Sequence, residues 1–457
     1  MGPEALGIVM LLLMVVAIMI GFPTAFTLMS LGITFGFLGL SQGGNGFLVF
    51  DLAVQRVFFI MQNDVLVAIP LFLFMGYLIE RAGILDELFH AVNVMFNWLP
   101  GSLAVATLAT GTIFATATGI VGASVTLLGL LAFPAMLRAG YNKRFAAGAV
   151  TASGTLGILI PPSVLLILYG FVAGVSVPRL YAGAFLPGFM LSFLYFAYIV
   201  VWSKLFPKDA PRAKQAEVEA MTGQEKLLLV LRGFVPIVSL ILFVMGSIFF
   251  GFATPSEGAA LGALGGFILA AAHKRLTFSM VKESVFLTVR ASSMVGWLLV
   301  GSSIFAAVFA RLGGAAVIGN FILGFDFSPE VFFWIVQIVI FVLGWPLEWT
   351  EITIIFLPLF LPLLADYHTR FPDNIATDPF FFGIMAALNQ QTSFLSPPVA
   401  MSAYYLKGVA GKSINLNEIF EGMYPFMAIQ VVSMGVLWFL PVLAYGPAIA
   451  VFGESLR

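Results

Sequence analysis

The sequence predicts an all-α polytopic membrane protein, built as an inverted structural repeat with two re-entrant helical hairpins and two broken helices. The first observation is composition: 61% of the 457 residues are hydrophobic and only 9% are charged, whereas soluble domains carry about 25% charged residues. Apolar runs of roughly 18 residues or more, long enough for a helix to cross a bilayer, recur from end to end. The other two observations are an internal repeat and two proline pairs within apolar segments.

The composition argues against several other classes of protein. No part of the chain shows the alternation over roughly ten residues that is typical of a transmembrane barrel strand. The chain has no cysteine, which excludes disulfides, thiolate chemistry and cysteine-ligated metals. Its net charge of −1 argues against nucleic acid as a partner. The expected surroundings are therefore a lipid bilayer.

The two halves of the chain resemble each other at matched positions. GFPTAFTLMSLG at 21–32 aligns with GFATPSEGAALG at 251–262, an offset of 230, and the proline pairs at 161–162 and 397–398 lie 236 residues apart. An offset this steady indicates duplication, with a few residues inserted in the second copy. The predicted parts are a first repeat at 1–202 (hairpin at about 100–137, broken helix at about 145–170), a cytoplasmic linker at 203–227, and a second repeat at 228–457 (hairpin at about 330–365, broken helix at about 380–406).

Charge predicts the orientation of the two copies. Six Lys and Arg residues lie between 203 and 232, which places the linker in the cytoplasm by the positive-inside rule. When the other charge clusters are assigned to the two sides of the membrane in turn, starting from the linker, the second copy crosses the membrane in the opposite orientation to the first. Both termini are then predicted to be periplasmic.

Two segments of about 37 residues must each begin and end on one side of the membrane. Two full spans need roughly 20 residues each plus a turn, so half-length arms that meet at a polar tip are expected. The tips are predicted at TATGIVGASV, around Thr118, and at GWPLEWTE, which contains Glu348 and Glu351. These two carboxylates either act within the membrane or lie at the water interface. Four segments are predicted to be amphipathic helices in the membrane plane: 44–63, 84–98, 275–289 and 312–326.

The proline pairs predict helices that break within the membrane. Each proline removes a backbone donor and crowds the preceding turn, and irregular backbone at membrane depth occurs only inside protein or beside a water-filled cavity. Secondary transporters use such breaks to present carbonyl oxygens to substrates and ions, and these hard oxygen ligands suit Na⁺. The hydroxyls and amides that can complete an ion's coordination shell are Ser153, Thr155, Gln390, Gln391, Thr392, Ser393 and Ser396. The alternative is that a proline pair simply ends one helix and starts the next.

Two long stretches that contain the proline pairs resemble the large membrane subunit of tripartite ATP-independent periplasmic (TRAP) transporters. They are GLLAFPAMLRAGYNKRFAAGAVTASGTLGILIPPSVLLILYG and LNQQTSFLSPPVAMSAYYLKGVA. GFATPSEGAALGAL at 251–264 and AIPLFLFMGYLIERAGI at 68–84 also match, so the resemblance covers essentially the whole chain. The first tip differs, because it reads TGIV at 118–121 where many relatives have the Ser-rich SGSS.

The resemblance implies an elevator-type secondary transporter of the bacterial inner membrane that a Na⁺ gradient drives. It implies two partners, a small integral membrane subunit and a periplasmic substrate-binding protein that delivers an organic acid. It implies no cofactor other than Na⁺ as the coupling ion. The implied Na⁺ ligands are Thr118, Gly119, Gly157, Ile160 and Pro161 at the first site, and Gly344, Thr350, Gln391, Thr392, Ser393 and Ser396 at the second. The implied substrate pathway contains Ser124, Ser153, Thr155, Ser163 and Gln390.

Three alternatives remain open from the sequence. A stand-alone Na⁺- or H⁺-coupled anion transporter of the same architecture differs only in needing no soluble partner. An intramembrane enzyme needs a catalytic Ser/His, paired Asp or metal-His constellation at depth, and the only histidines are His90, His273 and His368, all in expected connectors. A passive channel is the third alternative, although duplicated hairpins with ion-binding breaks suit a transporter with alternating access better than a continuous pore.

Overall fold

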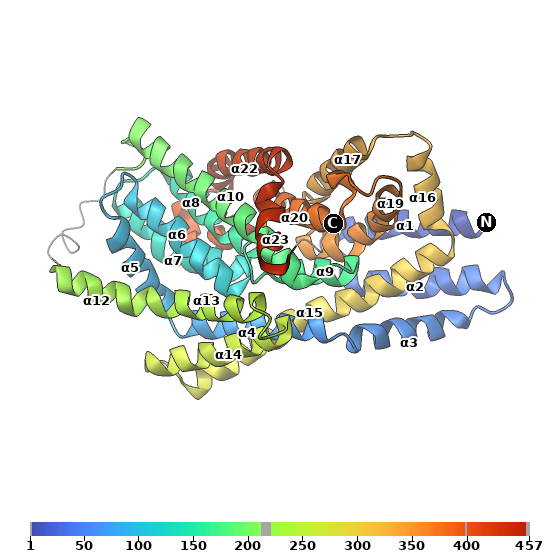
Figure 1. The fold of residues 1–457 in the computed structure, drawn as a ribbon, viewed down its shortest axis with the longest axis horizontal. Helices are drawn as coiled ribbons and strands as arrows, with labels where there is room; N and C mark the ends of the chain where they lie inside the picture. The colour runs from blue at the N-terminus through green and yellow to red at the C-terminus, as the bar shows by residue number, and fades with distance from the viewer. Residues whose placement is uncertain (1, 212–220, 398–399, 454–457) are drawn as a thin grey trace.

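The computed structural model describes residues 2–211, 221–397 and 400–453, and over these ranges it is helical throughout, with no strand (Figure 1). Nine of the described helices are long and apolar enough to cross a membrane. The helices of the first half are α1 (Pro3–Ile20), α2 (Thr24–Ser41), α3 (Leu48–Met61), α4 (Ala68–Arg81), α5 (Ile84–Phe96), α6 (Ser102–Thr118), α7 (Val121–Arg138), α8 (Lys143–Thr155), α9 (Val164–Ala173) and α10 (Val177–Leu205).

The second half has helices in a similar order. They are α12 (Gly223–Gly233), α13 (Val235–Phe249), α14 (Pro255–Ala272), α15 (Phe278–Arg311), α16 (Gly314–Leu323), α17 (Pro329–Leu343), α18 (Trp349–Glu351), α19 (Leu357–Arg370), α20 (Pro379–Gln390), α21 (Met401–Ala410), α22 (Leu416–Phe439) and α23 (Val442–Phe452). The succession of hairpin, broken helix and long helix therefore occurs once in each half. Much of the predicted linker lies at 212–220, outside the described residues.

A layer of long helices forms the lower part of the molecule in Figure 1 and combines both halves of the chain. Helix α2 packs along α15, and α4 packs along both α14 and α15. The helix α14 begins with a capping box, in which Thr254 accepts a hydrogen bond from the backbone N–H of Glu257 while the Glu257 carboxylate accepts one from the N–H of Thr254. Glu257 therefore caps α14.

The in-plane helix expected at 275–289 is part of one longer, continuous helix. Helix α15 has 34 residues, which at 1.5 Å per residue is about 51 Å and exceeds the roughly 30 Å of a bilayer's hydrocarbon core. The prediction of a separate in-plane helix was wrong because no proline interrupts 278–311, so nothing in the backbone forces a break there. In contrast, α3 and the helical segment Asp64–Arg81 that includes α4 are bent by 59° at a short break.

The arms of the hairpins are longer than the half-length arms expected. In the first hairpin α6 has 17 residues and α7 has 18, so each arm is about 26 Å long. The tip consists only of Gly119 and Ile120, and Gly119 adopts φ +62°, a left-handed conformation that suits glycine. Because so short a tip uses two residues, almost all of the segment is available for helix. The second hairpin has arms α17 and α18–α19, which are joined through 344–348.

The two halves interlock through their broken helices. The first broken helix packs α8 against α22 of the second half, and the second packs α21 against α7 of the first. At the α8–α22 contact Gly148 and Gly422 bring the two backbones together, since a Cβ built on Gly422 would lie 2.0 Å from the carbonyl oxygen of Arg144. Small residues of this kind allow close helix contact in membranes. Each broken helix therefore packs in part on a helix of the other half.

Candidate functional site

The first break separates α8 from α9. A short 3₁₀ turn at Leu156–Ile158 follows α8, and the cis Pro161-Pro162 pair precedes α9. The hydroxyl of Ser163 connects the two sides of the break, because it donates to the carbonyl of Ile158 and accepts a 3.4 Å hydrogen bond from the N–H of Leu166. Ser163 therefore acts as the N-cap of α9.

The tip of the first hairpin lies directly against the first break. A Cβ on Gly119 would lie 3.7 Å from the carbonyl oxygen of Pro162, and one on Gly157 would lie 2.8 Å from the carbonyl oxygen of Ala115. Thr118 is only 2% exposed, and its hydroxyl donates to the Phe114 carbonyl at 3.1 Å. The region offers backbone carbonyls beside apolar side chains: a Cβ on Gly119 would lie 3.6 Å from Cγ2 of Val164, whereas Ile160 packs on Gly188 of α10.

The second break separates α20 from α21 and is richer in polar side chains. The hydroxyl of Thr353, in the second hairpin, donates to the amide oxygen of Gln390 at 3.0 Å. The amide of Asn389 donates to the backbone carbonyl of Gln337 at 2.7 Å and to its side-chain oxygen at 2.9 Å. These bonds hold the end of α20 to both arms of the second hairpin. Of the second proline pair, Pro398 lies outside the described residues.

Several buried polar atoms at the second break have no hydrogen-bond partner among the described residues. They include both amide atoms of Gln391, the amide nitrogen of Gln390 and the hydroxyl of Ser393. More than about 90% of buried polar groups in folded proteins are paired. The hydroxyls of Thr392 and Ser396 donate to the carbonyls of Asn389 and Thr392, at 2.6 and 2.7 Å, which leaves their lone pairs free to coordinate a cation.

A small cavity lies between the second tip and the second break. Its volume is about 50 Å³, and it is lined by Leu347, Glu348, Trp349, Ser393, Phe394 and Met401. Gly344 packs on one of these residues, because a Cβ there would lie 2.2 Å from the Ser393 hydroxyl. Thr350, a predicted ligand, is buried but does not line this cavity, whereas Glu348 does.

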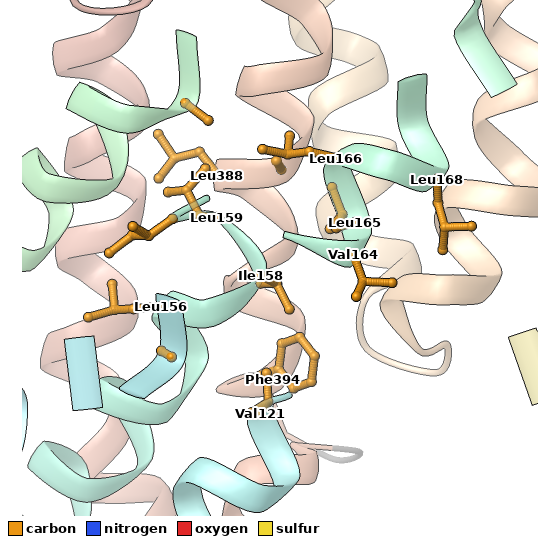
Figure 2. Close-up of a cluster of buried hydrophobic side chains, with 14 of the residues drawn as sticks. Val121, Leu156, Ile158, Leu159, Val164, Leu165, Leu166, Leu168, Leu388 and Phe394 are labelled. Atoms are coloured by element: carbon orange, nitrogen blue, oxygen red, sulfur yellow. The ribbon is translucent and has the colours of Figure 1, made fainter. Parts of the chain in front are cut away.

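The two breaks lie beside each other. Figure 2 shows Leu156, Ile158 and Leu159 of the first break in one hydrophobic cluster with Leu388 of α20 and Phe394 of the second break. The structure therefore brings each tip to the break of its own half and brings the two breaks together. The predicted pathway residues Ser124, Ser153 and Thr155 are fully buried, and each donates its hydroxyl to a carbonyl of its own helix region, at 2.9–3.0 Å.

A contact that the sequence did not indicate joins the second tip to the lower layer. The hydroxyl of Thr24, at the start of α2, donates to the carboxylate of Glu351. The other oxygen of that carboxylate accepts a 3.1 Å hydrogen bond from the N–H of Glu348, which caps α18. Thr24 is one of the positions that match between the two copies of the repeat, where it aligns with Thr254. Nothing in the sequence around Thr24 indicates a contact with Glu351, which lies 327 positions away.

Replacing Thr24 by valine tests this contact. Valine keeps the shape and removes the hydroxyl, and a hydrogen bond to a charged group contributes about 1.5–3 kcal/mol. We expect amide hydrogen exchange at 348–353 to become at least about fivefold faster, with no change in overall fold. Thr27→Val is the matched control, because the hydroxyl of Thr27 donates only to the carbonyl of Pro23. Equal exchange rates in the two variants would show that the contact does not hold the tip.

Fold and site define a multi-pass membrane protein with paired helix breaks, and comparison with known proteins identifies its family. Residues 11–443 match the family described as "Tripartite ATP-independent periplasmic transporter, DctM component". Because this match covers most of the chain, the protein belongs to that family. The prediction from the sequence motifs is thereby confirmed.

Relatives of the chain carry names that refer to several substrates. The C4-dicarboxylate TRAP transporter large permease protein DctM of Rhodobacter capsulatus is 26% identical over 88% of this chain and 89% of its own length. The sialic acid TRAP transporter large permease protein SiaM of Vibrio cholerae is 26% identical, over 89% and 90%. The isethionate TRAP transporter permease protein DctMQ of Oleidesulfovibrio alaskensis is 28% identical over 89% of this chain, which spans 61% of that relative.

A solved structure shares the fold. The YdaH transporter of Alcanivorax borkumensis aligns over 98% of this chain and 100% of its own, with a TM-score of 0.60 and 14% sequence identity. At that identity the likeness concerns the fold alone. Within the part of the chain that the structure describes, no group of three or more His, Cys, Asp or Glu side chains could hold a metal ion.

Proposed function

We propose that this chain is the membrane-spanning transport subunit of a Na⁺-coupled secondary importer that takes up an organic acid. A periplasmic binding protein delivers the substrate, and a small integral membrane subunit completes the permease in the bacterial inner membrane, with both termini periplasmic. The substrate class is supported by the names of the relatives, since C4-dicarboxylates, sialic acid and isethionate are all organic acids. Which acid is taken up depends on the binding protein.

The observation that supports ion coupling best is the set of unpartnered polar atoms at the second break. Gln391, Gln390 and Ser393 are buried with free amide or hydroxyl atoms, beside a hairpin tip. Leaving such groups without partners is costly in a low-dielectric interior. A bound cation coordinated by the oxygens, with the amide N–H groups turned to substrate or water, removes that cost. The first break supplies a second Na⁺ site mainly through backbone carbonyls near Thr118, Gly119, Gly157 and Pro161.

We further propose alternating access of the elevator type. The hairpins and broken helices form one interlocked unit, and the layer of α2, α4, α14 and α15 forms the surface past which this unit moves. Two contacts lie between them. One is the hydrogen bond of Thr24 to Glu351 described above, and the other is the packing of Gly76 of α4 on Thr118, where a Cβ on Gly76 would lie 2.8 Å from the Thr118 Cα. Ions at the breaks stabilise the tips against the breaks and so allow the loaded unit to move as a rigid body.

Exchange of Na⁺ for choline tests the function directly. In liposomes that contain the full permease, with binding protein loaded with radiolabelled C4-dicarboxylate, sialate or isethionate outside, we expect uptake only with an inward Na⁺ gradient. Choline chloride of equal ionic strength is expected to lower uptake to the level of empty liposomes. Thr392→Ala is expected to lower it at least about tenfold, because the residue is fully buried at the second break.

Three other outcomes of this assay separate the alternatives. Uptake of free substrate without any binding protein would identify a stand-alone anion transporter. Uptake that follows a pH gradient and ignores Na⁺ would make the proton the coupling ion. Uptake down a substrate gradient with no ion dependence would indicate a passive channel.

A further inference from the structure

A buried polar cluster that the proposed ion sites do not use lies where α22 packs on both α8 and α10 (Figure 1). Gln430 of α22 and Tyr195 of α10 are both fully buried. In this conformation the hydroxyl of Tyr195 and both amide atoms of Gln430 have no hydrogen-bond partner among the described residues. Because more than about 90% of buried polar groups in folded proteins are paired, two such side chains on neighbouring helices require an explanation.

The contacts between α8 and α22 show that these two helices run in the same direction. Near the start of α8, Arg144 forms an ion pair with Glu421. One turn further on, a Cβ on Gly148 would lie 2.0 Å from the carbonyl oxygen of Gly422 and 2.8 Å from Cε2 of Phe426. Residue numbers therefore rise together along the two helices, which pack in parallel.

This register brings Thr155, the last residue of α8, close to Gln430. Thr155 follows Gly148 by seven residues and Gln430 follows Gly422 by eight, which is about 10.5 Å and 12 Å along the two helices. The hydroxyl of Tyr195 lies within interaction distance of the side chains of both Gln430 and Thr155. The three side chains therefore form one cluster, next to the 3₁₀ turn at which the first break begins.

The available donors and acceptors determine the order of hydrogen bonds in this cluster. Thr155 donates its hydroxyl hydrogen to the carbonyl of Ala152 at 3.0 Å, so only its lone pairs remain, and these accept. The ring of Tyr195 is held in place, because it packs edge-on against Phe426 with the ring centroids 5.2 Å apart. The amide of Gln430 is the adjustable member, since the terminal torsion of a glutamine is broad. A turn of this amide lets its N–H donate to the Tyr195 oxygen while the Tyr195 hydroxyl donates to Thr155.

From this arrangement we infer that Tyr195 and Gln430 are positioning residues of the transporter. They hold the end of α8, and with it the start of the first break, from two other helices, and they contact neither ion nor substrate. The inference rests on the transport function proposed above, to which it adds the side chains that keep the first break in its folded geometry.

Helix α22 also reaches the second break. The hydroxyl of Ser396 lies 3.2 Å from Sδ of Met427, which precedes Gln430 by three residues, or about one turn. One helix therefore supports both breaks, the second through Met427 and the first through Gln430.

Amide hydrogen exchange of the full-length protein at 156–160 tests the inference, in choline chloride and in NaCl of equal ionic strength. Gln430→Met keeps the length of the side chain and removes the amide, and Tyr195→Phe removes only the hydroxyl. We expect each variant to exchange about fivefold faster than wild type at 156–160 in both salts, with unchanged rates at 391–396. Ser433→Ala is the matched control and is expected to match wild type, because Ser433 is also fully buried on α22 and donates to the carbonyl of Ile429 in its own helix at 2.8 Å.

Uptake separates positioning from a general loss of structure. In the liposome assay described above, we expect Gln430→Met to raise the half-saturating Na⁺ concentration about fivefold and to leave the half-saturating concentration of loaded binding protein unchanged. The double variant Tyr195→Phe/Gln430→Met is expected to show the effect of one single variant, because the two side chains act together. It also provides folded protein where a single variant does not, since replacing both partners by apolar groups is nearly neutral.

Each outcome supports or overturns the inference. Exchange at the wild-type rate at 156–160 would overturn it, and so would single effects that multiply in the double variant. An equal rise of both half-saturating concentrations would show a general loss of structure and would overturn it too. If wild-type uptake ignores Na⁺, the proposed coupling fails, while the exchange rates in choline chloride still test the role of Tyr195 and Gln430.

Discussion

Replacing Gly422 by valine is expected to prevent assembly of the folded protein. A Cβ at this position would lie 2.0 Å from the carbonyl oxygen of Arg144 and 3.1 Å from the backbone N of Gly148, so α8 and α22 must move apart. Backbone atoms cannot rotate away as a side chain can, and van der Waals contact is a main source of helix association in membranes. We expect the free energy of unfolding to fall by more than the roughly 1–3 kcal/mol that is typical of overpacking. The measurement is loss of the monodisperse peak in size-exclusion chromatography.

Gly435→Val provides the matched control on the same helix. A Cβ on Gly435 meets no heavy atom within 4 Å, so the added side chain has open space. We expect this variant to elute as wild type does, with an unfolding midpoint within a few degrees. If Gly422→Val behaves like Gly435→Val, the close approach of α8 and α22 is not a feature of the folded protein.

Replacing Gly344 by valine is expected to have the largest effect on ion binding. Gly344 has ordinary helical dihedral angles, with φ −64°, so valine introduces no backbone strain and acts only through space. Its Cβ would lie 2.2 Å from the hydroxyl and 3.0 Å from the Cβ of Ser393, which pushes the tip off the break. An overpacking energy of about 1–3 kcal/mol that opposes only the closed tip lowers Na⁺ affinity roughly 5- to 150-fold.

The measurement is the half-saturating Na⁺ concentration, taken once from the rise of the unfolding midpoint over a NaCl titration and once from the rate of uptake. Gly296→Val is the control, because a Cβ on Gly296 of α15 has no heavy atom within 4 Å. We expect Gly296→Val to bind Na⁺ as wild type does. Unchanged Na⁺ affinity in Gly344→Val would separate ion binding from contact between tip and break.

Much of the helical architecture could be predicted because its causes are local. Apolar length sets the spans, and a proline acts on its own backbone and the turn before it, so both breaks were found from the sequence. The errors arose where geometry depends on a few residues. The hairpin arms are longer than expected because Gly119 and Ile120 alone make the turn between them. Helix α15 is continuous because its sequence contains no proline that would break it.

The site could be predicted only in outline. Sequence reasoning selected polar residues around the breaks, and the structure gathers Gly344 and Ser393 at one tip and Gly119 and Gly157 near the other. Sequence reasoning did not predict the hydrogen-bond partners of the residues at the second break. Thr353 binds Gln390 across 37 positions, and Asn389 binds Gln337 across 52. Such pairs result from tertiary packing, and no spacing rule for a single helix contains them.

The reciprocal packing of the two halves also has a consequence for how the chain is made. Helix α8 leaves the ribosome roughly 260 residues before α22, its partner at the glycine contact. At 5–20 residues per second this is a delay of about 13–50 s. During that time α8 can already pack on α6 and α7, but its face at Gly148, which contacts Gly422 of α22, meets lipid or insertion machinery instead of protein. Biogenesis of this chain therefore requires that the incomplete first half be sheltered until the last spans arrive.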